Sequence, residues 1–474
     1  MSNYIPTIGI EVHVELKTAT KIFSSSINGY GQMANSLTNV VDLGYPGTLP
    51  TINKEVINLG IKAANILNCK IRKHMHFDRK NYFYPDNSKN YQITQFETPI
   101  GYDGYVEIEV NGTTKKVYIE EMHIEEDTCK STHRKEETLL DFNRAGVPLI
   151  EIVTKPCMTS PEEAKAYLER LKELLFYADI SDCKMEEGSM RADANVSIRK
   201  EGTEKLGTKV EIKNIGSISN VGLSIQKEIE RQKIIYDNNE TIIPQTRRFD
   251  DRLNDTVLMR LKETGNDYRY FPEPNIPFIN LTDEYIDKVL KTIPLLPDER
   301  RKLYKEKNIS ESNITKLIQN RNLSDYFNEL LKLDTSYQTA SNLLLGDISA
   351  YLNKEEKSIK ETKLRVEKLK ELTDMIENKE LTSKNVKDIL NMVMEEDLTV
   401  EEIVKKAGIE NISDENFIIE TVRNVIKENE ESVNDYKEGH DRAIKYLMGQ
   451  VMKLSQGKIN PQKAMELLKQ ELDN

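Results

Sequence analysis

The sequence predicts an α+β fold, in which a strand-rich N-terminal part precedes a helical remainder. Residues 1–280 hold 16 of the 21 glycines and 12 of the 15 prolines, so turns are concentrated there. Residues 281–474 hold the other five glycines and three prolines, and their apolar residues recur at helical spacing. The two parts meet near 280–295, after the proline-rich segment 271–277, which can form neither a helix nor a central strand.

Alternation of apolar and polar residues marks the strands of the first part. In the segment 8–16, the even positions are isoleucine, valine and leucine, whereas positions 11, 13 and 15 are glutamate, histidine and glutamate. An ordinary exposed strand face mixes Thr, Lys, Ser and Glu, so a face made only of acids and an imidazole is unusual. Acids at alternating positions recur near 119–127, in 190–199 and in 209–213.

Strands that each direct acids to one side predict a single sheet with one acidic face. Hard divalent cations prefer oxygen ligands, and Mg²⁺ commonly binds through a few carboxylates together with the phosphates of a substrate. Glu151 supports this reading, because it interrupts the apolar strand 149–153 and a buried lone carboxylate is costly unless it is paired or bound to metal. The residues alone therefore indicate chemistry on a magnesium–nucleotide complex.

The helical part begins at Thr282, which is placed to cap a helix over 283–293 with acids in its first turn. A second, weaker break falls in 408–414. Further helices are predicted over 340–352, 364–376 and 385–394 and from about residues 400, 416, 443 and 461. The predicted domains are therefore 1–293, 294–408 and 409–474.

Composition excludes several classes of protein. No run of 18 apolar residues is present, which predicts no transmembrane helix, and the N-terminus lacks the basic start and apolar run of a secretory signal. The four cysteines match no zinc or disulfide spacing and favour a reducing compartment, the cytoplasm. The net charge of −12 argues against a general nucleic-acid binder but allows a local basic patch.

Long motifs in a fixed order resemble one known family from end to end. They are 8–17 (IGIEVHVELK), 45–50 (YPGTLP), 77–86 (FDRKNYFYPD), 91–94 (YQIT), 123–128 (HIEEDT), 141–152 (DFNRAGVPLIEI), 185–197 (MEEGSMRADANVS), 210–214 (VEIKN), 245–250 (QTRRFD), 267–274 (DYRYFPEP), 449–453 (GQVMK) and 457–461 (GKINP). Together they resemble the B subunit of the aspartyl/glutamyl-tRNA amidotransferase, GatB of the GatCAB complex.

The resemblance implies a specific fold and reaction. The fold would be a cradle domain on a mainly antiparallel sheet, similar in its active sheet to glutamine synthetase, followed by a helical domain and a small YqeY-like tail that grips tRNA. The B subunit would use Mg-ATP to phosphorylate the side-chain carboxylate of Glu-tRNA(Gln) or Asp-tRNA(Asn). A glutaminase A subunit would supply ammonia through a tunnel, and a C subunit would brace the heterotrimer.

Position on the acidic strands then assigns the site. The residues expected on the metal–ATP face are Glu11, His13, Glu125, Glu151, Asp193 and Glu211. Imidazole prefers zinc and softer metals, so His13 would ligate through water or belong to a site that also accepts Mn²⁺. Arg191 and Lys213 would hold phosphate oxygens of ATP, or else balance the nearby acids; a salt bridge to Arg191 would likewise explain Asp193.

Two acids near this face are separated by strand geometry. Glu125 and Glu126 are neighbours in a strand and point to opposite faces, and Glu125 is expected on the side of Glu121 and His123. Glu15 is expected to be a solvent-facing or supporting residue.

The resemblance also assigns residues to ammonia and to tRNA. It places Lys80 and Tyr82 in a loop that lines the ammonia route, although a tyrosine-rich stretch is also typical of an ordinary packed loop. Surface arginines and basic helix ends are common without a ligand. The residues expected to contact tRNA or substrate are Arg247, Arg248, Lys453 and Lys458.

The sequence departs from the family in two places. Some members carry a cysteine-rich zinc ribbon near the first strand, but residues 23–50 contain no cysteine and carry serines at 24–26, so we expect no zinc and a loop held by hydrogen bonds. Cys129 and Cys183 stand where the family usually has glycine, and cysteine would cost stability if the backbone there needs a positive φ.

Two other functions stay open. The first is a free-standing carboxylate–amine ligase that takes ammonia from solvent, since the chain carries no amidase or cysteine glutaminase pattern. The second is a non-catalytic tRNA-binding paralogue. The helical tail argues against the first alternative, and the acids present on several strands argue against the second.

Overall fold

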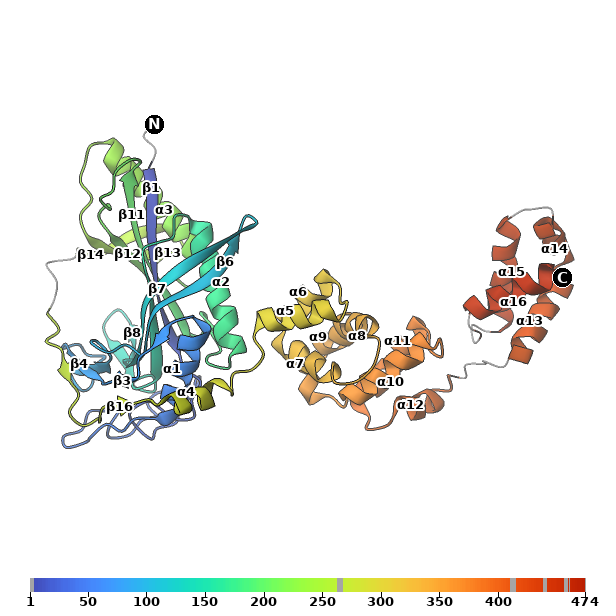
Figure 1. Ribbon diagram of the computed structural model, residues 1–474, viewed down its shortest axis with the longest axis horizontal. Coiled ribbons are helices and arrows are strands. Elements are labelled where there is room, and N and C mark those ends of the chain that lie inside the picture. Colours follow the sequence, from blue (N-terminus) through green and yellow to red (C-terminus); the bar gives the residue numbers. More distant parts are fainter. Residues whose placement is uncertain are drawn as a thin grey trace. The chain divides into compact units, whose positions relative to one another are not determined.

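The computed structural model describes residues 4–261, 267–409, 415–437, 441–455, 459 and 461–473. The chain divides into two compact units, Met1–Pro297 and Asp298–Asn474 (Figure 1). The first is built on a large sheet and the second is helical, which confirms the coarse α+β prediction. Buried apolar residues form three clusters, which span residues 8–289, 304–403 and 418–472. The finer boundaries at 293 and 408 stay a prediction.

The main sheet of the first unit has nine strands. Neighbours pair antiparallel except β12 and β13, which are parallel, so the sheet is mainly antiparallel as expected. In spatial order the strands are β14 (Asp255–Leu261), β13 (Gln245–Asp250), β12 (Val210–Lys213), β11 (Met190–Lys200), β1 (Tyr4–Glu15), β10 (Pro148–Thr154), β7 (Thr113–Glu126), β6 (Gly101–Val110) and β2 (Lys70–Ile71).

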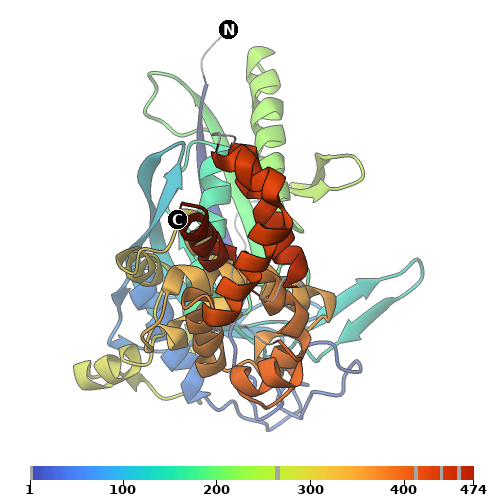
Figure 2. The same ribbon diagram turned by 90° about the vertical axis from the view of Figure 1, so that its right-hand side faces the viewer.

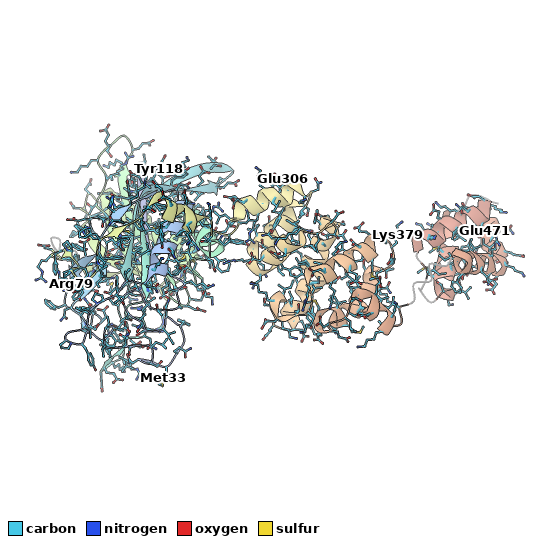
Figure 3. The ribbon with its side chains drawn as sticks, turned by 60° about the horizontal axis from the view of Figure 1, so that its bottom comes forward. Met33, Arg79, Tyr118, Glu306, Lys379 and Glu471 are labelled. Atoms are coloured by element: carbon cyan, nitrogen blue, oxygen red, sulfur yellow. The ribbon has the colours of Figure 1, made fainter. Side chains whose placement is uncertain are left out.

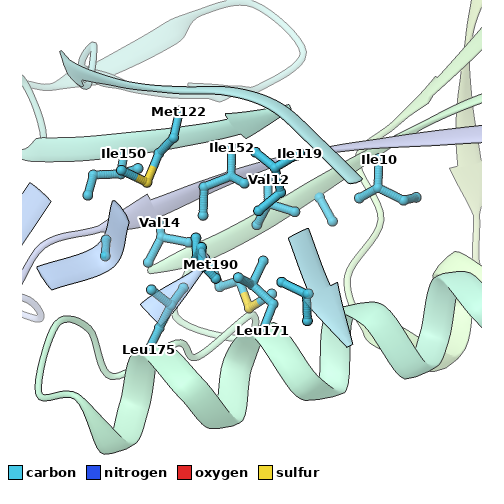
Figure 4. Close-up of a cluster of buried hydrophobic side chains, with 14 of the residues drawn as sticks. Ile10, Val12, Val14, Ile119, Met122, Ile150, Ile152, Leu171, Leu175 and Met190 are labelled. Atoms are coloured by element: carbon cyan, nitrogen blue, oxygen red, sulfur yellow. The ribbon is translucent and has the colours of Figure 1, made fainter. Parts of the chain in front are cut away.

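Three helices cover one face of this sheet: α1 (Lys54–Ile66), α2 (Pro161–Tyr177) and α3 (Ile218–Asp237). Each begins at a side-chain cap, which is Asn53, Ser160 or Ser217. Figure 4 shows the resulting core, in which apolar side chains of the central strands face leucines of α2. The apolar positions of each strand are therefore committed to this face, and the polar positions are left to the other.

The C-terminal end of α3 is fixed to the start of β1. The Tyr4 hydroxyl donates to Asp237 at 2.8 Å, and the Tyr4 ring stacks on Tyr236 with centroids 5.9 Å apart. Figure 2 shows α3 standing beside the strand at the end of the unit where the chain begins. The helix that connects parallel strands β12 and β13 is thus anchored at its far end to the central strand.

Smaller elements complete the first unit. A three-stranded sheet joins β15 (Phe271–Pro272), β4 (Asp78–Asn81) and β5 (Tyr91–Thr94), and β5 lies against β7. Helix α4 (Asp283–Leu290) is capped by Thr282, as predicted, and packs on α1. The remaining strands are β3 (His74–Met75) with β16 (Ile279–Asn280), and the hairpin β8 (Lys130–His133) with β9 (Thr138–Asp141).

The second unit is helical throughout its described residues. The helices predicted over 340–352, 364–376 and 385–394 are confirmed, the first of them interrupted by a π-helical turn, whereas α5–α7 and α14 were not predicted. The elements are α5 (Pro297–Glu306), α6 (Glu311–Gln319), α7 (Arg321–Leu330), α8 (Tyr337–Leu343), π-helix η1 (Leu344–Ile348), α9 (Ser349–Lys354), 3₁₀-helix η2 (Ile359–Glu361), α10 (Val366–Glu377), α11 (Ser383–Glu395), α12 (Val400–Lys406), α13 (Glu415–Glu428), α14 (Glu430–Lys437), α15 (Asp441–Leu454) and α16 (Pro461–Asp473). No helix of the described segments is long and apolar enough to cross a membrane.

The cysteine-free loop between β1 and α1 is organised around one buried carboxylate. Asp42 accepts hydrogen bonds from the hydroxyls of Ser24 at 2.6 Å and Ser26 at 2.5 Å, and it pairs with the fully buried Lys21 at 3.3 Å. Met33, at the edge of the unit in Figure 3, is 79% exposed in the same loop. Hydrogen bonds thus hold this loop, as we expected from its serines.

One of the two unusual cysteines has a strained backbone. Cys183 has a φ of +49°, a left-handed conformation that suits glycine, whereas Cys129 is not among the described residues with positive φ. The expected cost to stability therefore applies to Cys183 alone. Both thiols are buried, and burial raises the pKa of each.

We predict that Asp42→Ala destabilises the first unit by about 3–5 kcal/mol, because it leaves the buried charge of Lys21 without a carboxylate to neutralise it. Denaturant unfolding of the whole chain measures the loss. The control is Glu107→Ala, which removes a surface partner of Lys116 at 3.7 Å and should cost less than about 1 kcal/mol. Equal losses for the two variants would contradict the role given to Asp42.

Candidate functional site

The register of the antiparallel strands gathers the polar residues into rows across one face of the sheet. His13 of β1 lies opposite Arg191 of β11 on one side and Glu151 of β10 on the other, and Glu151 in turn lies opposite His123 of β7. In the next row, Glu11 lies opposite Asp193. This places acids from separate strands side by side on the face that the helices do not cover.

The centre of the face is a cluster of two histidines and two glutamates. The Nε2 atom of His13 lies 3.5 Å from Glu125 Oε1 and 3.6 Å from Glu151 Oε2. His123 Nε2 lies 2.8 Å from the same Glu151 oxygen and 3.9 Å from Glu125 Oε2. The other ring nitrogen of His123, Nδ1, is buried without a hydrogen-bond partner. Glu151 is thus the residue that both imidazoles share.

Burial and mutual repulsion set the charges of this cluster. Burial, then the charge of Glu151, raises the pKa of Glu11 to about 8, and burial, then Glu151, also raises the pKa of Glu125. Burial alone would raise the pKa of Glu151, but the hydrogen bond from His123 and the two imidazoles hold it well below its usual value. Burial would lower the pKa of His123, and Glu151 instead raises it to about 9.

This donor set fits a divalent cation. Two groups, Glu11–His13–Glu151 and His123–Glu125–Glu151, each bring their ligand atoms within 4.8 Å of one another. Buried carboxylates that raise each other's pKa gain most from a cation placed between them. The two groups share Glu151, which links the acids of β1, β10 and β7.

Asp193 and Glu211 lie beside this cluster and share one lysine. Lys213 Nζ donates to Asp193 Oδ2 at 2.5 Å and lies 3.2 Å from Glu211 Oε1, and Glu211 also accepts from Thr246 at 2.9 Å. Burial would lower the pKa of the Lys213 ammonium, but Asp193, Glu211 and Glu11 raise it. Lys213 is therefore a firmly charged group at the edge of the acidic cluster.

Arg191 is held on the other side of the cluster. Its guanidinium donates to Asp127 at 2.7 Å and lies in the field of Glu15, and its Nε atom is buried without a partner. Burial, then the charge of Asp127, raises the pKa of Glu15 to about 7. Glu15, which we expected to be a solvent-facing or supporting residue, is half-buried beside this ion pair.

Glu125 and Glu126 separate as the alternation requires. Glu125 faces the histidines, whereas Glu126 faces the opposite side, pairs with Lys89 and accepts from the backbone N–H of Ile93 at 2.9 Å. His123 is the residue of this face that sequence reasoning did not assign, although it stands two positions before Glu125 in the same alternating segment.

Lys80, expected in a loop, lies in strand β4, and Tyr82 follows directly after that strand. The Lys80 ammonium sits over the Tyr268 ring, 5.1 Å from its centroid, and Tyr82 meets Tyr268 edge-on at 6.3 Å. Burial would lower the pKa of Lys80, but the charges of Glu125, Tyr270 and Glu151 raise it. The structure thus brings Lys80 into the field of the acidic cluster.

The residues expected to meet tRNA are scattered. Arg247 points toward the helix-covered face, where it donates to Thr256 at 2.9 Å and lies 3.6 Å from the buried Glu228. Arg248, opposite Lys213 in the register, is half-exposed and pairs with Asp250 at 3.1 Å. Lys453 is exposed on α15, and Lys458 lies outside the described residues.

A cavity of about 590 Å³ opens where the acidic strand β1 ends. Glu15 and Ser189 line it beside the central strands, and loops 28–32, 141–144 and 185–188 close its sides. Its lining carries cations such as Lys17 and Arg144 among acids and amides. Glu15 is the residue of the polar face of β1 that lines the cavity, whereas none of the six residues assigned to the metal–ATP face does.

Comparison with known proteins agrees with this architecture. The family model described as the GatB/GatE catalytic domain matches residues 6–287, which contain the whole acidic face, and the model described as the GatB domain matches residues 325–472. The aspartyl/glutamyl-tRNA(Asn/Gln) amidotransferase subunits B of Bacillus velezensis and Geobacillus kaustophilus are each 46% identical over 472 residues, which is 99% of this chain and 99% of theirs. The chain therefore belongs to the GatB family of amidotransferase B subunits.

Proposed function

We propose that this chain activates the side-chain carboxylate of Glu-tRNA(Gln), of Asp-tRNA(Asn), or of both, and converts it to the amide. One observation carries the proposal. Four strands, β1, β7, β10 and β11, bring Glu11, His13, Glu125, Glu151 and Asp193 to a single face, and a cavity lined by Glu15 opens at the end of β1. Phosphoryl transfer depends on positioning and charge neutralisation more than on a covalent protein group, and such a face supplies both.

The cofactors that fit this site are ATP and Mg²⁺. The two histidines would also favour Mn²⁺ as a substitute metal. Glu11, His13, Glu125 and Glu151 would hold the metal centrally, and Asp193 and Glu211 would extend the site toward Lys213. When bound, the metal would neutralise phosphate charge and align the transferring group. No zinc is proposed for the loop between β1 and α1.

The chain's own residues would position the reactants. The substrate carboxylate oxygen attacks the terminal phosphorus of ATP and ADP leaves; ammonia then attacks the acyl carbon, phosphate leaves and a proton is lost. Lys213, held between Asp193 and Glu211, and Arg191, held by Asp127, each present a fixed cation to phosphate oxygens at the edges of the cluster. Lys80 and Tyr82 would line the route of the ammonia.

The partners follow from the same proposal. A glutaminase A subunit would deliver ammonia, a C subunit would brace the heterotrimer, and the assembly would work in the cytoplasm. The cradle, 1–293, would carry a glutamine synthetase-like active sheet, and 294–408 and the YqeY-like 409–474 would grip tRNA. Of the residues assigned to tRNA, Lys453 on α15 and Arg248 are exposed and would meet phosphate.

We predict that Glu125→Gln lowers ATP-dependent amidation by about 100-fold or more, because a hard cation loses a charged ligand that an amide replaces poorly. The rate is measured in the assembled complex together with the melting temperature and the partner's glutaminase rate, both of which should be unchanged. The control is Glu109→Gln, at an exposed position of β6. A wild-type amidation rate for the Glu125 variant would refute its assignment.

The isolated chain should amidate poorly with glutamine and measurably with a high concentration of ammonium. It carries the proposed activation site but no glutaminase pattern, so its nitrogen must come from outside. Amide formed on Glu-tRNA or Asp-tRNA is measured with each donor. Efficient use of glutamine by this chain alone would contradict the subunit reading, and activation of free glutamate but not of the tRNA ester would favour a stand-alone ligase.

Deleting residues 410–474 should leave the sheet unit folded, because the apolar cluster of 418–472 is separate from the cluster of 8–289. Affinity for aminoacyl-tRNA should fall, and its dependence on salt should become shallower as lysine–phosphate contacts are lost. Filter binding of the truncated complex at several salt concentrations gives both quantities. If affinity and slope stay as in the full chain, tRNA is bound elsewhere, and Arg248 is the next position to test.

A further inference from the structure

Asn81, the last residue of β4, holds a short turn that comes from far along the chain. Its backbone N–H donates to the carbonyl of Tyr268 at 3.0 Å, and its side-chain Nδ2 donates to the carbonyl of Arg269 at 2.8 Å. The two bonds grip consecutive carbonyls of the segment 267–270. Asn81 is thus the residue that ties this segment to the end of β4.

The turn at 267–270 has a backbone conformation that its residue types do not favour. Arg269 is exposed and has a φ of +49°, in the left-handed region that a residue with a Cβ atom rarely adopts. Its own N–H donates to the Asp267 side chain at 2.8 Å. A conformation of this kind persists when neighbouring groups fix it, and the Asn81 amide is the group from another strand that does so.

The turn carries two tyrosines whose rings contact each other, and one of them also contacts Lys80. The Tyr268 ring lies under the Lys80 ammonium at 5.1 Å, and the Tyr270 ring meets Tyr268 edge-on at 6.1 Å. Tyr270 is also stacked on Phe96, with centroids 4.0 Å apart and planes nearly parallel. The rings of Tyr268 and Tyr270 form an aromatic surface, which we call the tyrosine wall. The Lys80 ammonium lies over the first of these rings, and a cation is attracted to the face of an aromatic ring.

Lys80 lies close to the acidic cluster through the neighbouring strand. It is next to Asn81 in β4, which pairs with β5, and Thr94 of β5 donates to Glu125 at 3.5 Å. The charges of Glu125 and Glu151 act on the Lys80 ammonium. An ammonium at that place can hold an anion, such as the phosphate or carboxylate oxygen of the reacting group. The hydrogen bonds of Asn81 go to the turn and to the carbonyl of Arg79, and none goes to the acids, so an effect on the reaction would pass through the tyrosines and Lys80.

We propose that Asn81 is a positioning residue for amidation: by holding the Tyr268–Arg269 turn in its left-handed form, it sets the tyrosine wall that keeps the Lys80 ammonium beside Glu125 and Glu151. The inference rests on the proposed function. Folding of this region has separate support, because β15 pairs with β4 through Phe271 and Arg79, and Arg79 forms a two-bond ion pair with Glu273.

The test uses the assembled complex with ammonium chloride as nitrogen donor. Asn81→Ala should lower kcat by about 10-fold or more, since small misplacements of a positioning group are costly, and should leave the KM for tRNA near its wild-type value. The melting temperature and the partner's glutaminase rate should not change. Wild-type kcat for Asn81→Ala would overturn the proposal.

Two matched double variants distinguish an effect of the Arg269 backbone conformation from an effect of losing the Arg269 side chain. Asn81→Ala combined with Arg269→Gly should recover most of the lost kcat, because glycine adopts the left-handed conformation without a clamp. Asn81→Ala combined with Arg269→Ala removes the same side chain but keeps the Cβ atom, and should stay impaired. Equal recovery in both, or in neither, would overturn the proposal.

A double-mutant cycle with Lys80→Met tests the route of the effect. If Asn81 acts through Lys80, adding Asn81→Ala to Lys80→Met should cause little further loss of kcat, whereas losses that multiply would overturn the proposal. The wild-type complex is the control that distinguishes failure of the proposed function from failure of the positioning role of Asn81. A wild-type complex that forms no amide would refute the proposed function itself, whereas amide formation that is indifferent to Asn81 refutes only the positioning role.

Discussion

The acidic face depends on one constraint, the antiparallel register of β1 with its two neighbours. Because successive side chains of a strand point to opposite faces, a shift of one residue would turn Glu11 and His13 into the core and bring Val12 to the surface. The apolar face of β1 packs against α2 and its neighbours, and this burial fixes the register. Packing on one side of the sheet thus sets the chemistry on the other.

The acidic face brings several like charges close together, and their repulsion must be offset. Cations from three directions offset their repulsion: Lys213 from β12, Arg191 from β11 and Lys80 from β4. His123 adds a fourth at Glu151. Burial, and then the charge of Glu151, raises the pKa values of Glu11 and Glu125, so a cation would be bound most strongly at the centre of the cluster.

Alternation in the sequence could predict which residues share this face, because period-two patterning is local. It could not predict the pairing of strands. The placement of His123 opposite Glu151 and the half-buried position of Glu15 therefore become visible only when β7, β10 and β1 are aligned. The helices α1–α3 were missed among glycine-rich and proline-rich neighbours. The parallel pairing of β12 and β13 likewise depends on the crossover through α3, which composition does not reveal.

The central strand has a consequence for how the chain is made. β1 occupies residues 4–15, but its two neighbours are β10 at 148–154 and β11 at 190–200. On a ribosome that adds about 5–20 residues per second, the first strand waits roughly 10–40 s for its second partner. Once residue 154 has been made, β10 can cover one edge of β1, but the other edge stays open until β11 is complete. A chaperone that shields this edge would protect the nascent chain during the wait.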